Sequence, residues 1–336
     1  MTDPTPTPGI HHVTCIASDP QENLEFWVEV LGLRLVKRSV NQDDPGTYHF
    51  FFADAEGTPG TSMTFFPWEG LTPGAVGAGQ VARTAFRVPE GSLDYWEARF
   101  EEYGVDYDDR LERFGETVLP FRDPDGLPVE LVATGIPGDD PTVPWTAFVP
   151  ERAAIRGFHS VTLWLANPDP TADLLETMGF EEAGREQAAA GTPAEERTRF
   201  AADEPVGTYV DVCPVEERGE QGHGTVHHVA FQTPTDDDQR AMRSAVQSAG
   251  LRPTGQIDRH WFRSVYFREF NGVLFELATS GPGYTSDEAL SELGGRLVLP
   301  GTFADRRDGI EARLPDITVP RPTASEAGDY TGRRSP

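Results

Sequence analysis

The sequence predicts an α+β protein built from four βαβββ modules, and three observations support this prediction. A unit of strand, helix and further strands recurs four times along the 336 residues of the chain. In each unit, the glycine that ends the helix lies about 20 residues past the opening strand, and the last strand lies about 50 residues past it. Two of the opening strands also carry adjacent histidines, His11-His12 and His227-His228. The chain length suits two domains of about 150 residues each.

The first module shows the pattern most clearly. Its opening strand, over residues 9–17, is apolar and rich in β-branched residues. A helix is predicted over 21–31, because apolar residues recur at helical spacing, and Gly32 follows its last turn. Three strands separated by turns rich in Gly and Pro complete the module, at 33–40, 48–53 and 62–66.

The other three modules repeat this order of elements. Their opening strands, helices and closing strands are predicted at 81–88, 92–103 and 127–132, at 157–163, 172–178 and 208–212, and at 224–231, 239–249 and 272–277. The domain organisation expected from these positions is modules one and two over 9–134, a linker over 135–153, modules three and four over 154–284, and a C-terminal helix (306–314) with a mobile tail within 285–336.

The charge of the chain restricts the classes of partner. It has 55 acidic and 28 basic residues, for a formal net charge of -27, and Lys37 is the only lysine. Such an acidic excess repels phosphate backbones and anionic lipids, so neither nucleic acid nor a membrane is expected as a partner. The excess also favours a surface adapted to high salt, where screening relieves the repulsion between like charges.

Cysteine content and the N-terminus indicate the compartment. Cys15 and Cys213 are the only cysteines, which excludes a disulfide framework and a Cys-rich zinc site. The sequence contains no run of about 18 apolar residues, so no membrane-spanning helix is predicted. Residues 1–8 lack the basic and apolar regions of a signal peptide, so a cytoplasmic location is expected.

Adjacent histidines occur in two predicted strands, and the leading hypothesis is that both pairs contribute ligands to one shared metal ion. A single histidine in a strand is more often a hydrogen-bonded core residue than a ligand. Two histidines at equivalent positions of a repeat favour the metal, since the chain has only eight histidines and half of them lie in these pairs.

These motifs resemble those of the vicinal oxygen chelate superfamily, which includes glyoxalase I, fosfomycin-resistance proteins and extradiol dioxygenases. The chain is most similar to hydroquinone and catechol ring-cleaving dioxygenases of the PcpA/LinE/MhqO type. The resemblance runs from Gly9 to about Tyr284 and implies two open barrels, each made by two modules. The stretches that carry it are 9–14, 57–61, 157–160, 258–268 and 272–276.

The resemblance also implies where the metal ligands lie, since in this superfamily they come from one position in a module's first strand and one in its last. The opening position holds His12, Arg83, Ser160 and His228 in modules one to four, and the closing position holds Thr64, Glu130, Asp211 and Glu276. Only His12, His228 and Glu276 form the set of two histidines and one carboxylate that binds Fe(II), or Mn(II) with the same ligands. Modules one and four must then share a barrel, while Arg83 neutralises Glu130 in the companion barrel.

The resemblance implies further residues near the substrate. His11 and His227 are expected to be catalytic, although strand alternation directs each away from its neighbour unless the strand twists or bulges. Arg259 and Tyr266 match pocket positions of the family and are expected to orient a substrate hydroxyl. Their alternative roles are a surface ion pair and core packing. Thr14 lies on the same strand face as His12 and is expected to line the pocket, whereas His159 is expected to be structural.

The function implied is that of an Fe(II)-dependent, extradiol-type ring-cleaving dioxygenase acting on a small aromatic diol and O2. The sequence does not choose between hydroquinone and catechol, and family members commonly self-associate. One alternative is a glyoxalase-type isomerase or lyase, but those enzymes use four protein ligands, and Thr64 occupies the fourth position. A metal-free binding protein of the same fold has no need of the complete ligand set, and a structural metal would close its coordination sphere.

Overall fold

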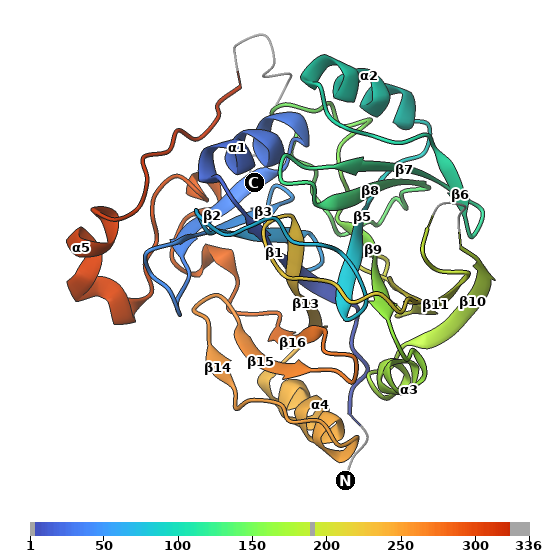
Figure 1. Ribbon diagram of the computed structural model, residues 1–336. Coiled ribbons are helices and arrows are strands. Elements are labelled where there is room, and N and C mark those ends of the chain that lie inside the picture. The colour runs from blue at the N-terminus through green and yellow to red at the C-terminus, as the bar shows by residue number, and fades with distance from the viewer. Residues whose placement is uncertain (1–3, 189–191, 323–336) are drawn as a thin grey trace.

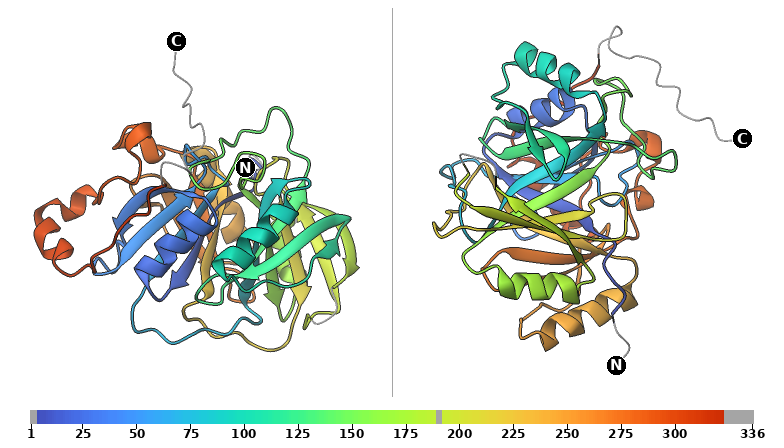
Figure 2. Two further views of the ribbon diagram at one scale, coloured as in Figure 1. Left: turned by 90° about the horizontal axis from the view of Figure 1, so that it is seen from above. Right: turned by 90° about the vertical axis from the view of Figure 1, so that its right-hand side faces the viewer.

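The fold is formed by two curled sheets of eight strands each, which lie side by side as half-barrels (Figures 1 and 2). The computed structural model describes residues 4–188 and 192–322. The first sheet has the order β14-β15-β16-β13-β1-β4-β3-β2. Its strands are β1 Ile10–Ala17, β2 Arg34–Val40, β3 Tyr48–Ala53, β4 Ser62–Pro67, β13 Thr225–Thr233, β14 Ile257–Asp258, β15 Arg263–Arg268 and β16 Leu274–Thr279.

The second sheet repeats this arrangement with the two middle modules, in the order β10-β11-β12-β9-β5-β8-β7-β6. Its strands are β5 Gln80–Pro89, β6 Leu111–Arg113, β7 Glu116–Arg122, β8 Pro128–Thr134, β9 Phe158–Leu165, β10 Glu181–Gln187, β11 Glu196–Ala201 and β12 Tyr209–Pro214. The predicted fold class is therefore confirmed.

Helices α1 and α2 lie at one end of the molecule and α3 and α4 at the other, while α5 lies apart from them at one side (Figures 1 and 2). Their bounds are α1 Pro20–Glu25, α2 Leu93–Tyr103, α3 Asp169–Thr177, α4 Asp236–Ser248 and α5 Arg307–Glu311. The helix predicted over 21–31 consists of α1 and a π-helical turn, η1 Phe26–Val30. It stops at Gly32, whose φ of 69° and close approach to Val149 leave no room for a Cβ.

The two ends of the repeat meet in the middle of the first sheet. Strand β1 pairs antiparallel with β13, while each of these strands pairs in parallel with the closing strand of its own module, β4 or β16. Modules one and four thus share one half-barrel, as expected, although more than two hundred residues separate their opening strands. The pairing of β1 with β13 is irregular between Ile10 and His12 and again between Thr14 and Cys15.

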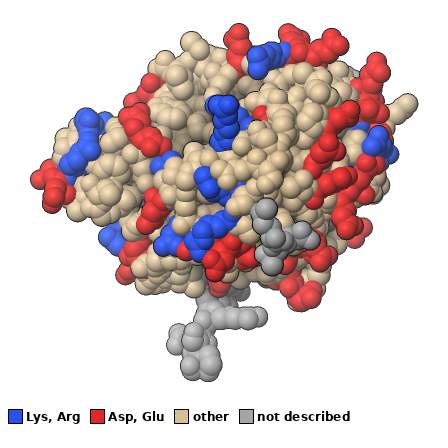
Figure 3. All heavy atoms as spheres, turned by 90° about the horizontal axis from the view of Figure 1, so that it is seen from below, with Lys and Arg blue, Asp and Glu red and all other residues tan. Residues whose placement is uncertain are grey.

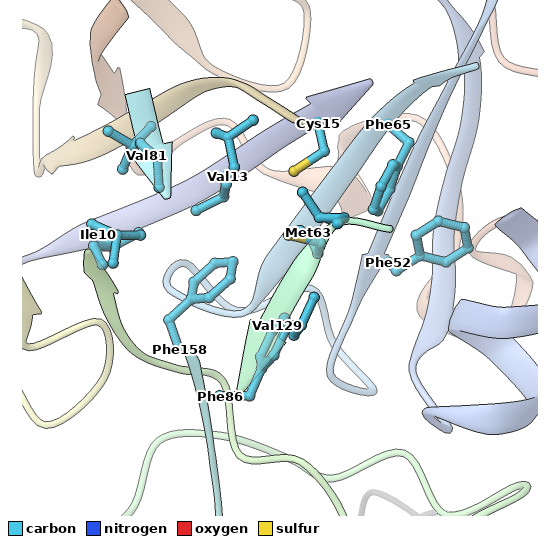
Figure 4. Packing of buried hydrophobic residues seen from close by; sticks show 14 of the residues in the cluster. Ile10, Val13, Cys15, Phe52, Met63, Phe65, Val81, Phe86, Val129 and Phe158 are labelled. Carbon is cyan, nitrogen blue, oxygen red and sulfur yellow. The ribbon is translucent and has the colours of Figure 1, made fainter. Parts of the chain in front are cut away.

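The main hydrophobic core lies between the two sheets (Figure 4). Val13 and Cys15 of β1 point into it and meet apolar side chains of the second sheet such as Phe86 and Phe158. Side chains alternate along a strand, so the intervening His12 and Thr14 face the concave side of the first sheet. One face of β1 therefore holds the half-barrels together, and the other is available for a site.

The chain after β16 packs against the outer strands of the first sheet. The Lys37 side chain of β2 is fully buried and forms ion pairs with Asp287 and Glu288. The 3-10 helices η2 Tyr284–Ser286, η3 Leu290–Glu292 and η4 Gly301–Arg306 precede α5, which covers part of the predicted helix over 306–314. Residues 323–336, where the mobile tail is expected, lie outside the described residues.

The surface carries the acidic excess in a dispersed form. Figure 3 shows acidic side chains spread over one face, with arginines scattered between them. Among the helices of the described chain, none is both long enough and apolar enough to span a bilayer.

Candidate metal centre

Three buried side chains from adjacent strands converge on the concave face of the first sheet. They are His12 of β1, His228 of β13 and Glu276 of β16, with exposed fractions of 2%, 4% and 0%. The two Nε2 atoms are 3.3 Å apart, and they lie 3.3 Å (His12) and 2.9 Å (His228) from Glu276 Oε2. The structure therefore brings together the three residues predicted as ligands.

Each of the two histidines is oriented by the histidine that precedes it. His11 Nδ1 lies 2.8 Å from His12 Nδ1, and His227 Nδ1 lies 2.8 Å from His228 Nδ1. Burial lowers the pKa values of His11 and His227 to about 3, so both rings are neutral and can accept at Nδ1. The hydrogen on His12 and His228 is then held at Nδ1, which leaves both Nε2 lone pairs directed at Glu276.

The local strand geometry explains why neighbouring histidines touch. In a regular strand, successive side chains point to opposite faces. Here the pairing of β1 with β13 is irregular twice, leaving His11 unpaired on β1 and His227 unpaired on β13. Each of these rings meets that of its neighbour, at interplanar angles of 79° and 78°. This is the bulge that the sequence analysis allowed for.

Glu276 adds a carboxylate oxygen to the two Nε2 atoms, and such a cluster of acceptor atoms can bind a cation. Its Oε1 accepts from Ser264 Oγ at 2.5 Å, whereas Oε2 faces the two histidines. Oε2 is enclosed and accepts no hydrogen bond within the described chain. A cation held between this oxygen and the two Nε2 atoms would satisfy all three acceptors.

The spacing of the three atoms suits a metal ion. A metal with ligand bonds of about 2.1 Å at right angles separates its ligand atoms by about 3.0 Å. The observed separations of 2.9–3.3 Å are close to this value. The ligand set is also chemically that of non-haem iron or manganese, so the residues present fit such a group.

A cavity of about 340 Å³ opens onto this cluster. Aromatic side chains make most of its wall, and polar residues of the segment 41–44 lie at its rim. The lining residues are His12, Thr14, Asn41, Gln42, Asp43, Asp44, His49, Phe51, Phe66, Trp68, His227, His228, Arg259, Trp261, Phe262, Tyr266 and Leu274.

Arg259 and Tyr266, predicted near the substrate, both line this cavity. The Arg259 guanidinium lies 5.4 Å from the centroid of the Tyr266 ring, and its Nη2 donates to Asp43 at 3.0 Å. Burial raises the pKa of Tyr266, so its hydroxyl keeps its proton and can donate. Arg259 thus forms an ion pair with Asp43 and also lines the cavity.

The remaining predicted residues are divided between the cavity and its surroundings. Thr14 lines the cavity, and its Oγ1 lies 2.8 Å from Thr64 Oγ1. His227 also lines it, beside its neighbour His228. His11 does not: it lies behind His12 against Phe262, with ring centroids 5.2 Å apart, and lines a separate small cavity.

Sequence reasoning missed several residues of the cavity. His49 is one, and its signal was a single polar residue in the otherwise apolar strand 48–53. Trp261 is another, held by Asp287, whose Oδ2 accepts from Trp261 Nε1 at 2.9 Å and lies 2.8 Å from His260 Nε2. Because Asp287 also pairs with Lys37, the segment after β16 supports one wall of the cavity.

The companion half-barrel contains ion pairs where the first sheet has its acceptor cluster. Glu130 is held mainly by Arg113, whose Nη1 donates at 2.5 Å, while the predicted partner Arg83 is 3.6 Å away. Asp211 likewise accepts from Arg197 and Arg199 at 2.8 Å. The partner Arg113 was not anticipated, because it lies on β6, which is separated from β8 by β7 in the sheet.

Comparisons with known proteins agree with the fold and with the arrangement of modules. The family model for the "Glyoxalase/Bleomycin resistance protein/Dioxygenase superfamily" matches residues 9–131 and 142–277. The chain is 42% identical to the "Putative ring-cleaving dioxygenase MhqO" of Bacillus subtilis, over 93% of this chain and 97% of that protein. It is 31% identical to the "Chlorohydroquinone/hydroquinone 1,2-dioxygenase" of Sphingobium indicum, over 95% and 99%.

Solved structures show the same likeness. The crystal structure of a "putative dioxygenase" from Bacillus subtilis matches with a TM-score of 0.88 and 42% identity, covering 94% of this chain and 99% of that one. Glyoxalase I from Zea mays matches with a TM-score of 0.58 at 15% identity, covering 81% and 92%. The second match shows a shared fold alone.

Proposed function

Because the chain belongs to the glyoxalase/bleomycin resistance protein/dioxygenase superfamily, we propose that it is a ring-cleaving dioxygenase acting on a dihydroxybenzene. The observation that carries this proposal is a cluster of two imidazoles and one carboxylate on the floor of an aromatic-lined cavity. Such a ligand set leaves coordination positions open for substrate and O2. The relatives named as ring-cleaving dioxygenases support the same reaction class.

His12, His228 and Glu276 would hold the metal, with Fe(II) favoured by the chemistry and Mn(II) compatible with the same ligands. When bound, the metal supplies a Lewis acid for a phenolic hydroxyl and a path for electrons between the ring and O2. His11 acts through His12 and is a positioning residue, because it contacts the ligand and does not line the cavity.

His227 and Tyr266 would act on the reactants. With its Nδ1 accepting from His228, the neutral His227 carries its hydrogen at Nε2 and can donate a hydrogen bond to an oxygen atom in the cavity. Tyr266 holds its proton and offers a second donor, while the fixed charge of Arg259 stabilises negative charge that develops on the ring oxygens. Thr14 lies on the neighbouring wall and packs against the ring.

The cavity itself suits a flat aromatic ring that must be kept from water. Phe51, Phe66 and Phe262 line it, and Asp43 and Asp44, which also line it, are exposed to solvent. Exclusion of water strengthens the electrostatic interactions inside and protects reactive species from side reactions. Cleavage beside the hydroxyl-bearing carbon, of extradiol type, is the outcome we assign to this arrangement.

A glyoxalase-type isomerase is disfavoured by the position that matches Glu276 in module one. Thr64 stands there, and its hydroxyl is already engaged by Thr14 at 2.8 Å and His49 at 3.0 Å. Among the described residues, no second carboxylate therefore joins His12, His228 and Glu276 as a fourth ligand.

The test is anaerobic reconstitution with Fe(II) or Mn(II), followed by oxygen uptake with hydroquinone and with catechol. We expect one O2 molecule to be consumed per ring. When isotopically labelled O2 is supplied, both of its oxygen atoms should be found in the acyclic product. Glu276→Gln should lose at least about 100-fold in metal affinity together with activity. The matched variant Glu130→Gln, at the same position of module two, should keep both.

Two results would contradict the proposal. One is isomerisation of a hemithioacetal without oxygen uptake, which would favour the glyoxalase reading. The other is activity that survives Glu276→Gln and is lost with Glu130→Gln, measured per mole of folded protein. Circular dichroism of both variants identifies losses that come from unfolding.

A further inference from the structure

One histidine of the cavity takes no part in the chemistry described so far. His49 lies in β3, two strands away from β1 and on the same concave face. Its neighbours Tyr48, Phe50 and Phe51 are buried and aromatic, whereas His49 itself is half-buried and lines the cavity. Burying a polar ring in such a strand costs free energy unless its nitrogen atoms are hydrogen-bonded.

The orientation of His49 is fixed on three sides. Its ring lies between Phe51 and Phe66, with centroid separations of 3.9 Å and 4.4 Å. Its Nε2 lies 3.0 Å from Thr64 Oγ1, which in turn lies 2.8 Å from Thr14 Oγ1. The ring is therefore preorganised, since packing and one hydrogen bond already hold it.

The second nitrogen of His49 is left for a ligand. Within the described chain, Nδ1 of His49 has no hydrogen-bond partner, and this atom is not enclosed by protein atoms. It is therefore open to the cavity. Burial lowers the pKa of His49 well below its usual value, so the ring is neutral. Nδ1 then offers one hydrogen bond, as donor or acceptor according to the direction of the bond to Thr64.

The position of His49 selects the part of the ligand that it meets. It lines the same cavity as His12 and His228, and in the part of the chain that the structure describes it makes no direct hydrogen bond with either. Tyr266 and Arg259 come from the other side, at β15 and the segment before it. A ring anchored at the cluster by one hydroxyl would present its opposite substituent to the β3 wall.

We propose that His49 Nδ1 hydrogen-bonds the second hydroxyl of a para-dihydroxybenzene, and so acts as a specificity-determining residue. This inference rests on the proposed function. Two adjacent hydroxyls, as in catechol, would both be directed at the cluster and leave His49 unpaired. A hydroxyl on the far side of the ring can donate and accept, so it suits either tautomer of His49.

The experiment is anaerobic titration of the metal-loaded protein with hydroquinone, catechol and phenol. The native protein should bind hydroquinone about tenfold more tightly than phenol, the gain expected for one well-placed hydrogen bond. His49→Phe should reduce hydroquinone affinity to that of phenol, while phenol affinity and metal content stay unchanged. His49→Asn, which keeps a polar group, should retain part of the preference.

Steady-state kinetics provide a second readout, with His223→Gln as a matched control outside the cavity. His49→Phe should raise KM for hydroquinone about tenfold with little change in kcat, because the lost contact exists before the reaction begins. His223→Gln should leave both constants unchanged.

The inference is overturned if His49→Phe binds hydroquinone as tightly as the native protein, or if it weakens phenol and hydroquinone equally. A native protein that binds hydroquinone selectively but consumes no O2 with any diol would overturn the proposed function alone. The two failures are therefore distinguishable.

Discussion

The paired histidines show how much of a metal site is decided at the level of single atoms. His12 and His228 have their Nε2 atoms aimed at Glu276 because His11 and His227 occupy the Nδ1 atoms. A contact of this kind fixes both the tautomer and the direction of the ligand ring. The first histidine of each pair thus acts through the second, and two adjacent histidines in a sequence do not reveal this division of roles.

We therefore predict that His11→Phe weakens metal binding by about 10- to 100-fold without changing the fold. The ring of Phe retains the packing against Phe262 but cannot accept from His12. Competition with a fluorescent chelator measures the affinity. His159→Phe is the control, because His159 occupies the equivalent position of module three and bonds Glu116 instead. Equal affinity in the native and His11→Phe proteins would contradict the orienting role.

A second prediction at this scale concerns a buried carboxyl away from the cavity. Burial raises the pKa of Asp123 to about 7, although its Oδ1 accepts backbone N–H bonds from Asp125 and Leu127. The folded state thus holds a proton that the unfolded chain releases near pH 4. The stability from this proton is present below pH 4 and is lost as the pH rises toward 7.

Asp123→Asn should remove that pH dependence while its amide oxygen keeps both backbone bonds. Relative to the native protein, the variant should gain stability progressively between pH 4 and pH 7, up to about 4 kcal/mol. Denaturant unfolding of both proteins at matched pH values measures the difference. A constant difference across that range would show that Asp123 has an ordinary pKa.

At the scale of the element, a glutamate at the same position of the closing strand has different partners in modules two and four. Glu276 of β16 and Glu130 of β8 occupy equivalent closing strands, and both are buried. Two histidines surround Glu276, whereas Arg113 and Arg83 surround Glu130 and bring its pKa down to about 2 against the effect of burial. The repeat supplies the position, and the neighbouring strands decide whether it binds a cation or an arginine.

The buried pair in the companion half-barrel gives an element-scale prediction. Glu130→Leu should destabilise the protein by about 3–5 kcal/mol, because it leaves Arg113 buried without its main partner. Adding Arg113→Met should recover much of that loss, since an apolar pair of similar volume avoids the desolvation cost. Chemical denaturation of the two single variants and the double variant closes the cycle. Additive effects would show that the two side chains act independently.

The whole molecule brings its two chain ends into one sheet. Strands β1 and β13 are neighbours, and the three predicted ligands belong to β1, β13 and β16. A metal bound there connects the first module to the last. The second sheet contains modules two and three and supplies none of the three predicted ligands.

Removing the metal should therefore loosen one half-barrel selectively. Stabilisation by the metal should reach about 2.7 kcal/mol when its free concentration is 100 times Kd. We expect faster hydrogen exchange in β1, β13 and β16 after chelation, and unchanged exchange in β5, β8 and β9. Mass spectrometry of peptides from each strand measures this. The same treatment should have no effect on Glu276→Gln, and uniform changes over both sheets would contradict a local role.

The sequence by itself was sufficient for the modules, which follow from local or periodic features: alternating strands, the glycine after each helix, and histidines at matching positions of a repeat. Its motifs also carried the resemblance that implied the family and the pairing of modules one and four. The ligand set is an expectation of the same kind, and the structure places His12, His228 and Glu276 in contact. Local rules suffice here because each module repeats one short pattern.

Only the tertiary structure decided which other side chains meet the ligands. The places of His49 and Trp261 in the cavity, and the ion pair of Arg113 with Glu130, depend on how the strands are arranged within each sheet. His11 lies behind its neighbour because the pairing of β1 with β13 is irregular, and no sequence pattern records that irregularity. Curl and register are properties of whole sheets, set by the packing of both faces, and so they are fixed only when the two half-barrels close on their shared core.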